Sequence, residues 1–265
     1  MNRFDKLFAQ QGRKAFVPFF TLGDPDWSTS LEIIVSAVEA GADALELGYP
    51  FADPISDGPT NQKSMQRALR AGATFDSSTK LVATIRQRYP ELPIGLLLYY
   101  NLLFFQEDAG YQKIAGAGVD AVVISDLPFE ESGRHMDCLR RHDIGCVQMV
   151  APNTPAERAR VLFDQSGAFT YVISRFGTTG ADRQLSAATL QRTRLLRSIT
   201  EKPYLVGFGI SHPESVRQLW DTGADGVIVG SHFISMIERN VGAIAPAISG
   251  ICSFIDDVKS PVLNS

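Results

Sequence analysis

Short hydrophobic runs alternate along the whole chain with longer segments in which hydrophobic residues recur at helical spacing. The short runs predict eight strands, which span residues 16–21, 44–47, 94–99, 121–125, 146–150, 170–174, 204–206 and 226–229. The longer segments predict helices that include 30–40, 78–88, 131–142, 155–165, 187–199 and 213–221. Because neighbouring parallel strands need a crossover connection, this order predicts repeated β-α-β units.

The order of these elements predicts an α/β fold, a single (β/α)₈ TIM barrel, for which about 250 residues are typical. The chain has 265 residues and no break in composition, so we predict one domain over residues 1–265. Phe4, Leu7 and Phe8 recur at helical spacing and predict an N-terminal helix. We also expect extra helices in the loops after strands two and eight, and a final helix over 243–258.

The composition excludes several classes of protein. A hydrophobic fraction of 45% and a charged fraction of 20% are ordinary for a globular protein. The net charge of −4 and the lack of a basic stripe argue against nucleic-acid binding. No apolar stretch is long enough for a membrane span, and the N-terminus lacks the apolar core of a secretion signal. Cys138, Cys146 and Cys252 have no metal-ligand spacing, which favours reduced thiols in a cytoplasmic protein.

Glu46 interrupts a hydrophobic run at the end of the second predicted strand. Burying a carboxylate is unfavourable by several kcal/mol unless the group is paired or protonated. The following loop carries Asp53 and Asp57 and is stiffened by Pro50 and Pro54. An acid in so unfavourable a place, with further acids in a rigid loop beside it, indicates catalytic machinery. The alternative is a structural acid that neighbouring backbone groups satisfy.

Glycines follow strands seven and eight, where this fold usually binds phosphate. Gly207 and Gly209 follow the seventh strand, and Gly230 and Ser231 follow the eighth at the start of a predicted helix. Glycine lets backbone N–H groups approach an anion closely, and the N-terminus of a helix attracts it. We therefore predict a phosphate ester as ligand, although turns that merely connect elements would also need glycine. The loop 175–182 is suited to a lid over the same phosphate or to a plain connection.

The residues for several neighbouring chemistries are missing from the sequence. A Schiff-base aldolase needs a desolvated lysine near a strand end, and only Lys63 follows a loop on the expected catalytic side. His135 and His142 share one helix and are expected to be solvated, while His212 and His232 form no ligand pair, so no metal site is predicted. No phosphate-binding Walker loop or dinucleotide fingerprint occurs in context. Acid/base chemistry by carboxylates on an apolar phosphate ester remains.

The motifs on which this interpretation depends follow one another in a familiar order. The chain resembles the tryptophan synthase α subunit over essentially its whole length. The motifs that carry the resemblance are Phe16-Val17-Pro18-Phe19, Thr21-Leu22-Gly23-Asp24-Pro25, Glu46-Leu47-Gly48-Tyr49-Pro50-Phe51-Ala52-Asp53-Pro54, Asp57-Gly58-Pro59-Thr60, Gly177-Thr178-Thr179-Gly180, Gly207-Phe208-Gly209-Ile210-Ser211 and Gly230-Ser231. Their order and spacing together make the resemblance specific.

The resemblance implies retro-aldol cleavage of indole-3-glycerol phosphate into indole and glyceraldehyde 3-phosphate, without a cofactor in this chain. Glu46 is then the acid/base residue and Asp57 its carboxylate partner. The implied substrate-binding residues are Phe19, Leu97, Tyr99, Val123, Ser125, Tyr171, Thr179 and Phe208, and the implied phosphate-binding residues are Gly180, Gly209, Gly230 and Ser231. The implied partner is a β subunit that holds pyridoxal phosphate, in an αββα heterotetramer, with Asp53, Pro54 and Pro128 near the contact.

Reasoning from the residues adds a division of labour. Burial is expected to raise the pKa of Glu46 toward neutrality, while Asp57, in a more polar loop, is expected to stay ionised and to accept the indole N–H. Asn101 and Asp126 are expected to brace loops. The chain also departs from the family pattern at four positions, namely Tyr49, Asn61, Val123 and His232.

Other functions stay open at this point. Another enzyme of the barrel class, such as a phosphoribosyl isomerase, normally relies on a different acid/base constellation. A stand-alone indole-releasing lyase differs chiefly in needing no β subunit. A noncatalytic activator of a β-type partner is the third alternative, and the acid pair Glu46 and Asp57 argues against it.

Overall fold

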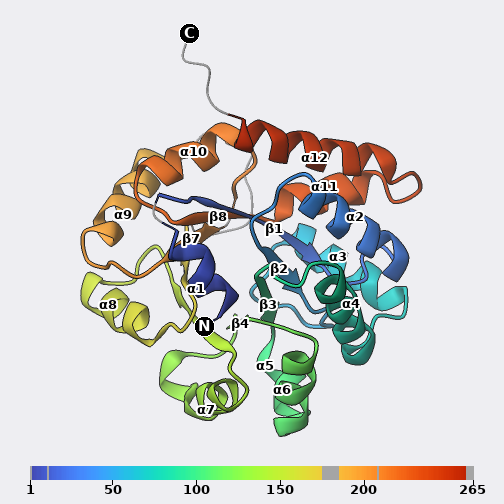
Figure 1. Ribbon diagram of the computed structural model, residues 1–265, viewed down its shortest axis with the longest axis horizontal. Helices are drawn as coiled ribbons and strands as arrows, with labels where there is room; N and C mark the ends of the chain where they lie inside the picture. The colour runs from blue at the N-terminus through green and yellow to red at the C-terminus, as the bar shows by residue number, and fades with distance from the viewer. Residues whose placement is uncertain (1, 11, 175–184, 208, 261–265) are drawn as a thin grey trace.

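A closed barrel of parallel strands forms the centre of the molecule (Figure 1). The computed structural model describes residues 2–10, 12–174, 185–207 and 209–260. Within these ranges the eight strands follow the chain order around the barrel, and β8 pairs with β1. They are β1 (Ala15–Thr21), β2 (Leu45–Gly48), β3 (Ile94–Leu98), β4 (Ala121–Ile124), β5 (Gly145–Val150), β6 (Thr170–Ile173), β7 (Tyr204–Gly207) and β8 (Gly226–Val229). The predicted TIM barrel is confirmed, and each predicted strand end lies within one residue of the observed one.

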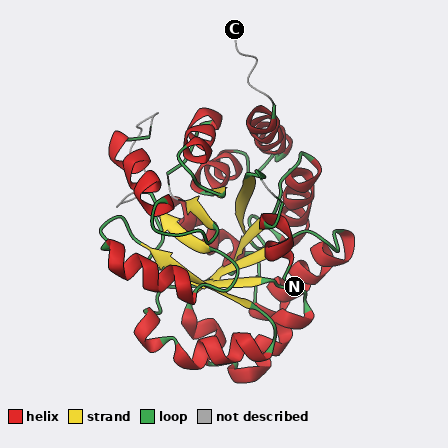
Figure 2. Ribbon diagram, turned by 60° about the vertical axis from the view of Figure 1, so that its left-hand side comes forward, coloured by secondary structure: helices red, strands yellow, loops and turns green. Residues whose placement is uncertain are grey.

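Helices surround the strands on the outside of the barrel (Figure 2). In the described ranges they are α1 (Arg3–Phe8), α2 (Trp27–Glu39), α3 (Pro59–Arg70), α4 (Phe75–Arg88), α5 (Tyr100–Phe104), α6 (Glu107–Gly116), α7 (Gly133–Arg141), α8 (Ala156–Gln165), α9 (Ala187–Arg197), α10 (Pro213–Asp221), α11 (Ser231–Arg239) and α12 (Ala245–Lys259). A 3-10 turn, η1 (Phe129–Glu131), precedes α7. The N-terminal helix and the extra helices after β2 and β8 are confirmed. The short α5 after β3 was not predicted.

Capping residues explain why two helices begin earlier than their hydrophobic pattern. Asp26 accepts a hydrogen bond from the Thr29 backbone N–H at 3.0 Å and starts α2, and Thr74 forms a capping box with Ser77 at the start of α4. Such caps satisfy backbone N–H groups that have no partner within the helix. The predicted starts, 30 and 78, were therefore three residues late.

The register between strands decides which side chains face the interior. Phe19 pairs with Glu46, Gly48 pairs with Leu97, and Leu97 pairs with Val123. Paired residues in a sheet point to the same face, and alternate residues along one strand share that face. Going round the barrel, Met149 pairs with Tyr171, which pairs with Leu205. A single inward-facing set therefore joins residues that lie far apart in the sequence.

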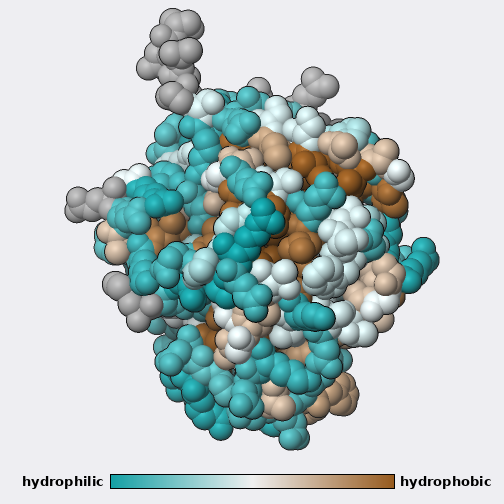
Figure 3. Space-filling view, turned by 45° about the vertical axis from the view of Figure 1, so that its right-hand side comes forward, coloured by the Kyte–Doolittle hydropathy of each residue, from teal (hydrophilic) through white to brown (hydrophobic). Residues whose placement is uncertain are grey.

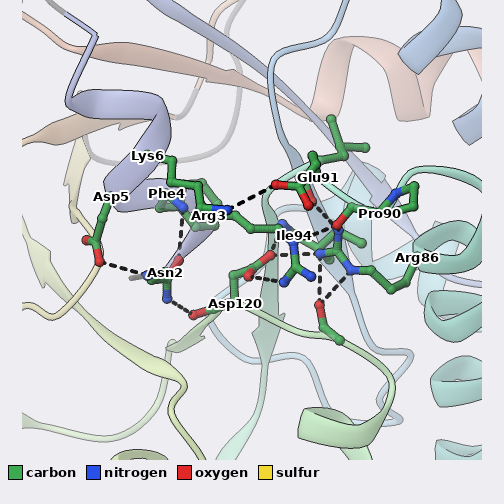
Figure 4. Close-up of polar contacts among 12 residues, drawn as sticks. Asn2, Arg3, Phe4, Asp5, Lys6, Arg86, Pro90, Glu91, Ile94 and Asp120 are labelled. Atoms are coloured by element: carbon green, nitrogen blue, oxygen red, sulfur yellow. Dashed lines mark hydrogen bonds and ion pairs between the residues drawn. The ribbon is translucent and has the colours of Figure 1, made fainter.

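One end of the barrel is formed by the N-terminal ends of the strands. The helix α1 closes this end and crosses it in Figure 1. Phe4 of this helix is buried and packs against Phe169 with ring centroids 5.0 Å apart. Asp120, which precedes β4, accepts hydrogen bonds from Arg3 and Arg86 at 2.8 Å each and from the Ile94 backbone N–H at 2.9 Å (Figure 4). This buried carboxylate is thus fully compensated and ties α1, α4 and β3 together.

Hydrophilic residues dominate the face of the molecule shown in Figure 3, with hydrophobic residues visible near its middle and at its upper right. The most exposed large hydrophobic side chains among the described residues are Phe105 at 79% and Ile55 at 73%. None of the helices in the described part of the chain has the length and hydrophobicity needed to cross a bilayer.

One expectation about the histidines is wrong. His135 is buried rather than solvated, because it lies on the same face of α7 as Cys138 and Leu139. The Tyr111 hydroxyl lies 2.8 Å from His135 Nδ1, and burial lowers the pKa of His135 to about 4. A neutral core histidine is the consequence. Cys138 is also buried, and all three cysteines are free thiols, as predicted.

Candidate active site

Glu46 projects into the barrel from β2. Its side chain follows the inward-facing register with Phe19 of β1, and only 2% of the residue is exposed. Oε1 of Glu46 is buried and has no hydrogen-bond partner among the described residues. Burial, and secondarily the negative charge of Asp57, raise the pKa of Glu46 to about 8. The carboxyl group is therefore protonated at neutral pH and can act as an acid.

Asp57 lies in the loop after β2 and is held by donors from two directions. The Tyr99 hydroxyl, just beyond β3, donates to Oδ2 at 2.6 Å, and the Asn61 amide of α3 donates to Oδ1 at 3.0 Å. Burial is the larger influence and raises the pKa of Asp57 above its usual value, while these two hydrogen bonds oppose the rise. The loop is thus less polar than the sequence suggested, and specific donors rather than solvent favour the charged form.

Tyr99 fastens this loop to the barrel. Its hydroxyl accepts hydrogen bonds from the Ser56 backbone N–H at 3.1 Å and from the Ser56 side chain at 2.8 Å. Its ring stacks on Phe51 with centroids 5.0 Å apart. The loop that carries Asp57 therefore has a defined position relative to the end of β3.

Polar contacts also fix α3, the helix that follows the loop. Arg67 donates two hydrogen bonds of 2.8 Å to the buried carboxylate of Asp24, which lies after β1. The hydroxyls of Thr21 and Ser64 lie 2.6 Å apart. A bidentate arginine–carboxylate pair holds both groups in one geometry. The helix α3, whose first turn contains Asn61, is therefore anchored to the end of β1.

Other predicted substrate-binding residues share the inward-facing register. They are Phe19, Leu97, Val123, Ser125 and Tyr171, of which Leu97 and Ser125 are half-buried and the rest are buried. Burial and the nearby charges of Glu46 and Asp57 raise the pKa of Tyr171, which places its hydroxyl in the same electrostatic environment. The structure thus brings Glu46, Asp57 and these side chains together at the carboxyl ends of the strands.

The glycines beside this site leave room for aromatic rings. A Cβ atom on Gly207 would lie 2.1 Å from the Tyr171 hydroxyl, and one on Gly48 would lie 2.8 Å from the Phe19 ring. A Cβ atom on Gly230 would also meet the Phe19 ring, at 3.0 Å. The glycine requirement at these positions therefore has a packing reason in addition to the predicted phosphate.

The predicted phosphate end lies where β7 and β8 finish. Gly209 has φ of 71°, a left-handed conformation that favours glycine, and Gly230 precedes α11, whose first residue is Ser231. Backbone N–H groups at the start of such a helix suit an anion. Thr179, Gly180 and Phe208, also predicted here, lie outside the described residues, as does the whole of the loop 175–182.

The predicted partner-contact residues lie at the periphery. Asp53 and Pro128 are exposed and Pro54 is half-buried. Asp126 accepts a hydrogen bond from the Tyr100 backbone N–H at 2.8 Å and so braces the start of α5. Asp126 therefore braces a loop, as predicted, and that loop is the one after β3. No group of three His, Cys, Asp or Glu residues in the described ranges could hold a metal ion.

Two of the residues that depart from the family pattern have side chains that pack away from the site. Tyr49 is buried, its hydroxyl lies 2.9 Å from the Thr79 hydroxyl, and its ring packs on Phe75 of α4. The ring of His232 packs against Phe254 of α12 with centroids 5.3 Å apart. Neither side chain is therefore directed by these contacts toward the substrate region.

One residue and one hydrogen bond of the site were missed. Met149 shares the inward face with Tyr171 and is half-buried, and the alternation along β5 would have identified it. The hydrogen bond from Asn61 to Asp57 was also missed, although their spacing of four residues brings side chains together at a helix start.

A closed parallel barrel with the buried acid Glu46 and the half-buried acid Asp57 toward the carboxyl ends of its strands, beside glycine turns after β7 and β8, is the arrangement expected of a TIM-barrel enzyme that uses acid/base chemistry. Comparison with known proteins identifies which one. The family model described as "Tryptophan synthase alpha chain" matches residues 4–258. The chain belongs to the tryptophan synthase alpha chain family, a family of lyases in tryptophan biosynthesis, as the sequence predicted.

Individual relatives agree. The tryptophan synthase alpha chain of Methanothermobacter thermautotrophicus is 44% identical over 238 residues, which cover 89% of this chain and 88% of the relative. That of Serratia proteamaculans is 41% identical over 98% of both chains. Among solved structures, the alpha subunit from Legionella pneumophila has a TM-score of 0.85 at 28% identity, covering 97% of both chains. A chain of the tryptophan synthase a2b2 complex from Pyrococcus furiosus has a TM-score of 0.84 at 33% identity, covering 92% of this chain and 97% of that one.

Proposed function

We propose that this chain cleaves indole-3-glycerol phosphate into indole and glyceraldehyde 3-phosphate. The observation that carries the proposal is Glu46, a protonated acid inside the barrel whose Oε1 has no partner among the described residues. A buried polar atom without a hydrogen-bond partner destabilises a folded protein, so its presence indicates a functional role. Membership of the family indicates the substrate, and the buried acid indicates that the bond is cleaved by proton transfer.

Proton transfers at two positions account for the reaction. Indole leaves poorly as a carbanion, so its C3 atom must gain a proton before the bond to the side chain breaks. Glu46 donates this proton, and the resulting carboxylate accepts the proton of the side-chain hydroxyl. The electron pair of that O–H bond forms the aldehyde, and the pair of the broken C–C bond returns to the ring as indole. The net proton count is unchanged.

Asp57 stabilises the charge that develops on the ring. Protonation at C3 places positive charge on the ring nitrogen, and a carboxylate that accepts the ring N–H opposes that charge most strongly where water is excluded. The hydrogen bonds from Tyr99 and Asn61 favour the charged form of Asp57 and oppose the effect of burial, which raises its pKa. The two acids thus take different roles because their hydrogen-bond environments differ.

The remaining assignments follow from the same proposal. Phe19, Leu97, Tyr99, Val123, Ser125, Tyr171, Thr179 and Phe208 bind the indole and glycerol parts, and Gly180, Gly207, Gly209, Gly230 and Ser231 bind the phosphate. The cleavage needs no cofactor in this chain. Residues 1–265 act as one domain, and the protein works in the cytoplasm.

A β subunit is the proposed partner. Pyridoxal phosphate belongs to that subunit, which receives the indole within an αββα heterotetramer. Exposed residues at the catalytic end, Asp53 and Pro128 with half-buried Pro54, form part of the contact. A solved structure of the a2b2 complex of Pyrococcus furiosus supports this assembly, since one of its chains resembles this chain at 33% identity over 97% of its length.

The purified chain mixed with indole-3-glycerol phosphate, with and without a β subunit, tests the proposal. We expect slow release of indole by the chain alone and a large increase when the partner is added. Equal rates with and without partner would indicate a stand-alone lyase. Activation of the partner without any cleavage would indicate a noncatalytic activator.

A further inference from the structure

Asn61 belongs to the environment of Asp57, and its contacts are unusual for a structural amide. Its Nδ2 donates to Asp57 Oδ1 at 3.0 Å, while its Oδ1 is buried and has no hydrogen-bond partner among the described residues. A carboxylate only accepts hydrogen bonds, so the atom that faces Asp57 must be the amide nitrogen. The orientation of the amide is therefore determined by its partner.

The two oxygens of Asp57 have separate donors. Tyr99 supplies a hydroxyl to Oδ2 and Asn61 supplies an amide to Oδ1. Each carboxylate oxygen has a second acceptor position, so both donors can stay in place while Asp57 accepts a further hydrogen bond from a ligand. Among the residues that the structure describes, the other titratable groups that interact electrostatically with Asp57 are the acid Glu46 and the phenol Tyr171, and neither is a cation.

No cation among the described groups offsets the charge of Asp57, since burial, Tyr99 and Asn61 are the causes that act on its pKa. Neutral donors must therefore favour the carboxylate. We propose that Asn61 is a positioning residue that holds Asp57 charged and aimed, and that its free Oδ1 shares the ring N–H of the bound substrate. This inference rests on the proposed function, because the ring N–H comes from an indole substrate.

The free oxygen gives the inference its specificity. A buried amide oxygen without a partner loses its hydrogen bonds to water and gains none from the protein. A ligand that brings an N–H donor to Asp57 brings it beside the amide bonded to that carboxylate. A ligand of the same shape without the donor would leave Asn61 Oδ1 unpaired.

The first test is the pH dependence of kcat/KM for Asn61→Leu, a change close in volume that removes both polar atoms. Loss of a hydrogen bond to a charged group should raise the pKa of Asp57 by about one unit, so the acid limb should move to higher pH by about one pH unit. Asn61→Ser, which keeps a polar residue in the first helical turn but cannot reach Asp57, should move the limb in the same direction.

Gln62→Met is the matched control. Gln62 donates from the same turn of α3 to the backbone oxygen of Asp57 at 2.8 Å, and so does not touch the carboxylate. Its substitution should leave the acid limb in place. A limb that stays in place in both Asn61 variants, or that moves equally in the control, would overturn the inference.

A double-mutant cycle separates positioning from general destabilisation. In the wild-type chain, Asn61→Leu should lower kcat/KM about tenfold, and in the Asp57→Asn chain it should have little further effect. The same loss in both backgrounds would contradict an action through Asp57.

Binding tests the free oxygen directly. A non-cleavable indol-3-yl-alkyl phosphate should bind Asn61→Leu about three- to tenfold more weakly, and its N-methyl counterpart should bind both proteins alike. Equal weakening of both ligands would overturn the shared N–H. Failure of the wild-type chain to release indole would instead contradict the proposed function, so the two failures can be told apart.

Discussion

The two ends of the barrel each bury an acid, and they treat it in opposite ways. At the closed end, Asp120 is 4% exposed and receives two arginines and a backbone N–H (Figure 4). At the catalytic end, Glu46 is 2% exposed, and its neighbour Asp57 adds negative charge. A compensated acid stabilises the fold, whereas an uncompensated one stays protonated and is ready to transfer its proton. Burial alone therefore does not distinguish structure from function, but the surrounding charges do.

The largest effect on activity is expected from Glu46→Gln. The amide keeps the shape but cannot transfer a proton, so turnover should fall about 10²- to 10⁴-fold. Indole release measures the loss, and the thermal melting temperature should not fall, because no charge needs compensation at position 46. Wild-type turnover in a folded sample would refute the acid/base role.

At the closed end of the barrel, Asp120→Asn should reduce the stability of the fold rather than the rate of catalysis. Removing the charge leaves Arg86, whose side chain is 11% exposed, without its ionic partner. We expect the free energy of unfolding to fall by about 3–5 kcal/mol in urea denaturation. Turnover per folded molecule should stay close to wild type. A selective loss of turnover at unchanged stability would mean that the two ends do not differ as described.

Asp57→Asn should lower kcat by about 10²-fold, roughly 2.7 kcal/mol in the barrier, because its charge opposes charge on the ring in a site that excludes water. The pKa of Glu46 should also fall, since Asp57 contributes to raising it. Steady-state kinetics across pH measures both effects. Near-normal rates would place the ring stabilisation elsewhere.

The stability of the folded chain should also depend on pH through Glu46, and the direction of the change is definite. The pKa of Glu46 rises from 4.5 to about 8 on folding, so between these values the folded chain binds more protons than the unfolded chain. Stability is then greatest below the unfolded pKa and is lost as pH rises toward the folded one. From pH 6 to pH 8 this group should remove about 2 kcal/mol, a slope that Glu46→Gln should lack in urea unfolding. Parallel pH profiles for the two proteins would contradict the raised pKa.

The smallest effect is expected at Tyr49, close to Glu46 in sequence but on the other face of the strand. Tyr49→Phe removes a hydrogen bond to Thr79 and should reduce stability by about 1 kcal/mol. Catalysis should not change, because the side chain packs on α4. A marked fall in kcat/KM would show that Tyr49 communicates with the site.

The barrel and its acids could be predicted because each depends on a local pattern. Strands and helices differ in hydrophobic spacing, and Glu46 is conspicuous within an apolar run. The face of the sheet to which a side chain points depends on whether it is an even or an odd number of residues from a reference position on the strand. Tyr49 is three residues from Glu46 and therefore points to the opposite side, which adjacency alone does not reveal.

Contacts between distant segments were harder to predict. His135 was predicted to be solvated because histidine is a polar residue. Its position on the same helical face as Cys138 and Leu139 buries it instead. The Tyr99 hydroxyl meets Asp57 across 42 residues of sequence, and no local pattern encodes that meeting. The compensation of Asp120 by Arg3 likewise spans 117 residues. Tertiary packing, rather than propensity, determines these partners.

The protonation state of Glu46 tests the central claim most directly. Infrared difference spectra between the wild-type chain and Glu46→Gln, recorded across pH, isolate the carboxyl group of this residue. A protonated acid band at neutral pH that titrates near pH 8 is the expected result. A carboxylate band already present at pH 6 would show that the acid inside the barrel is compensated, and would contradict the account.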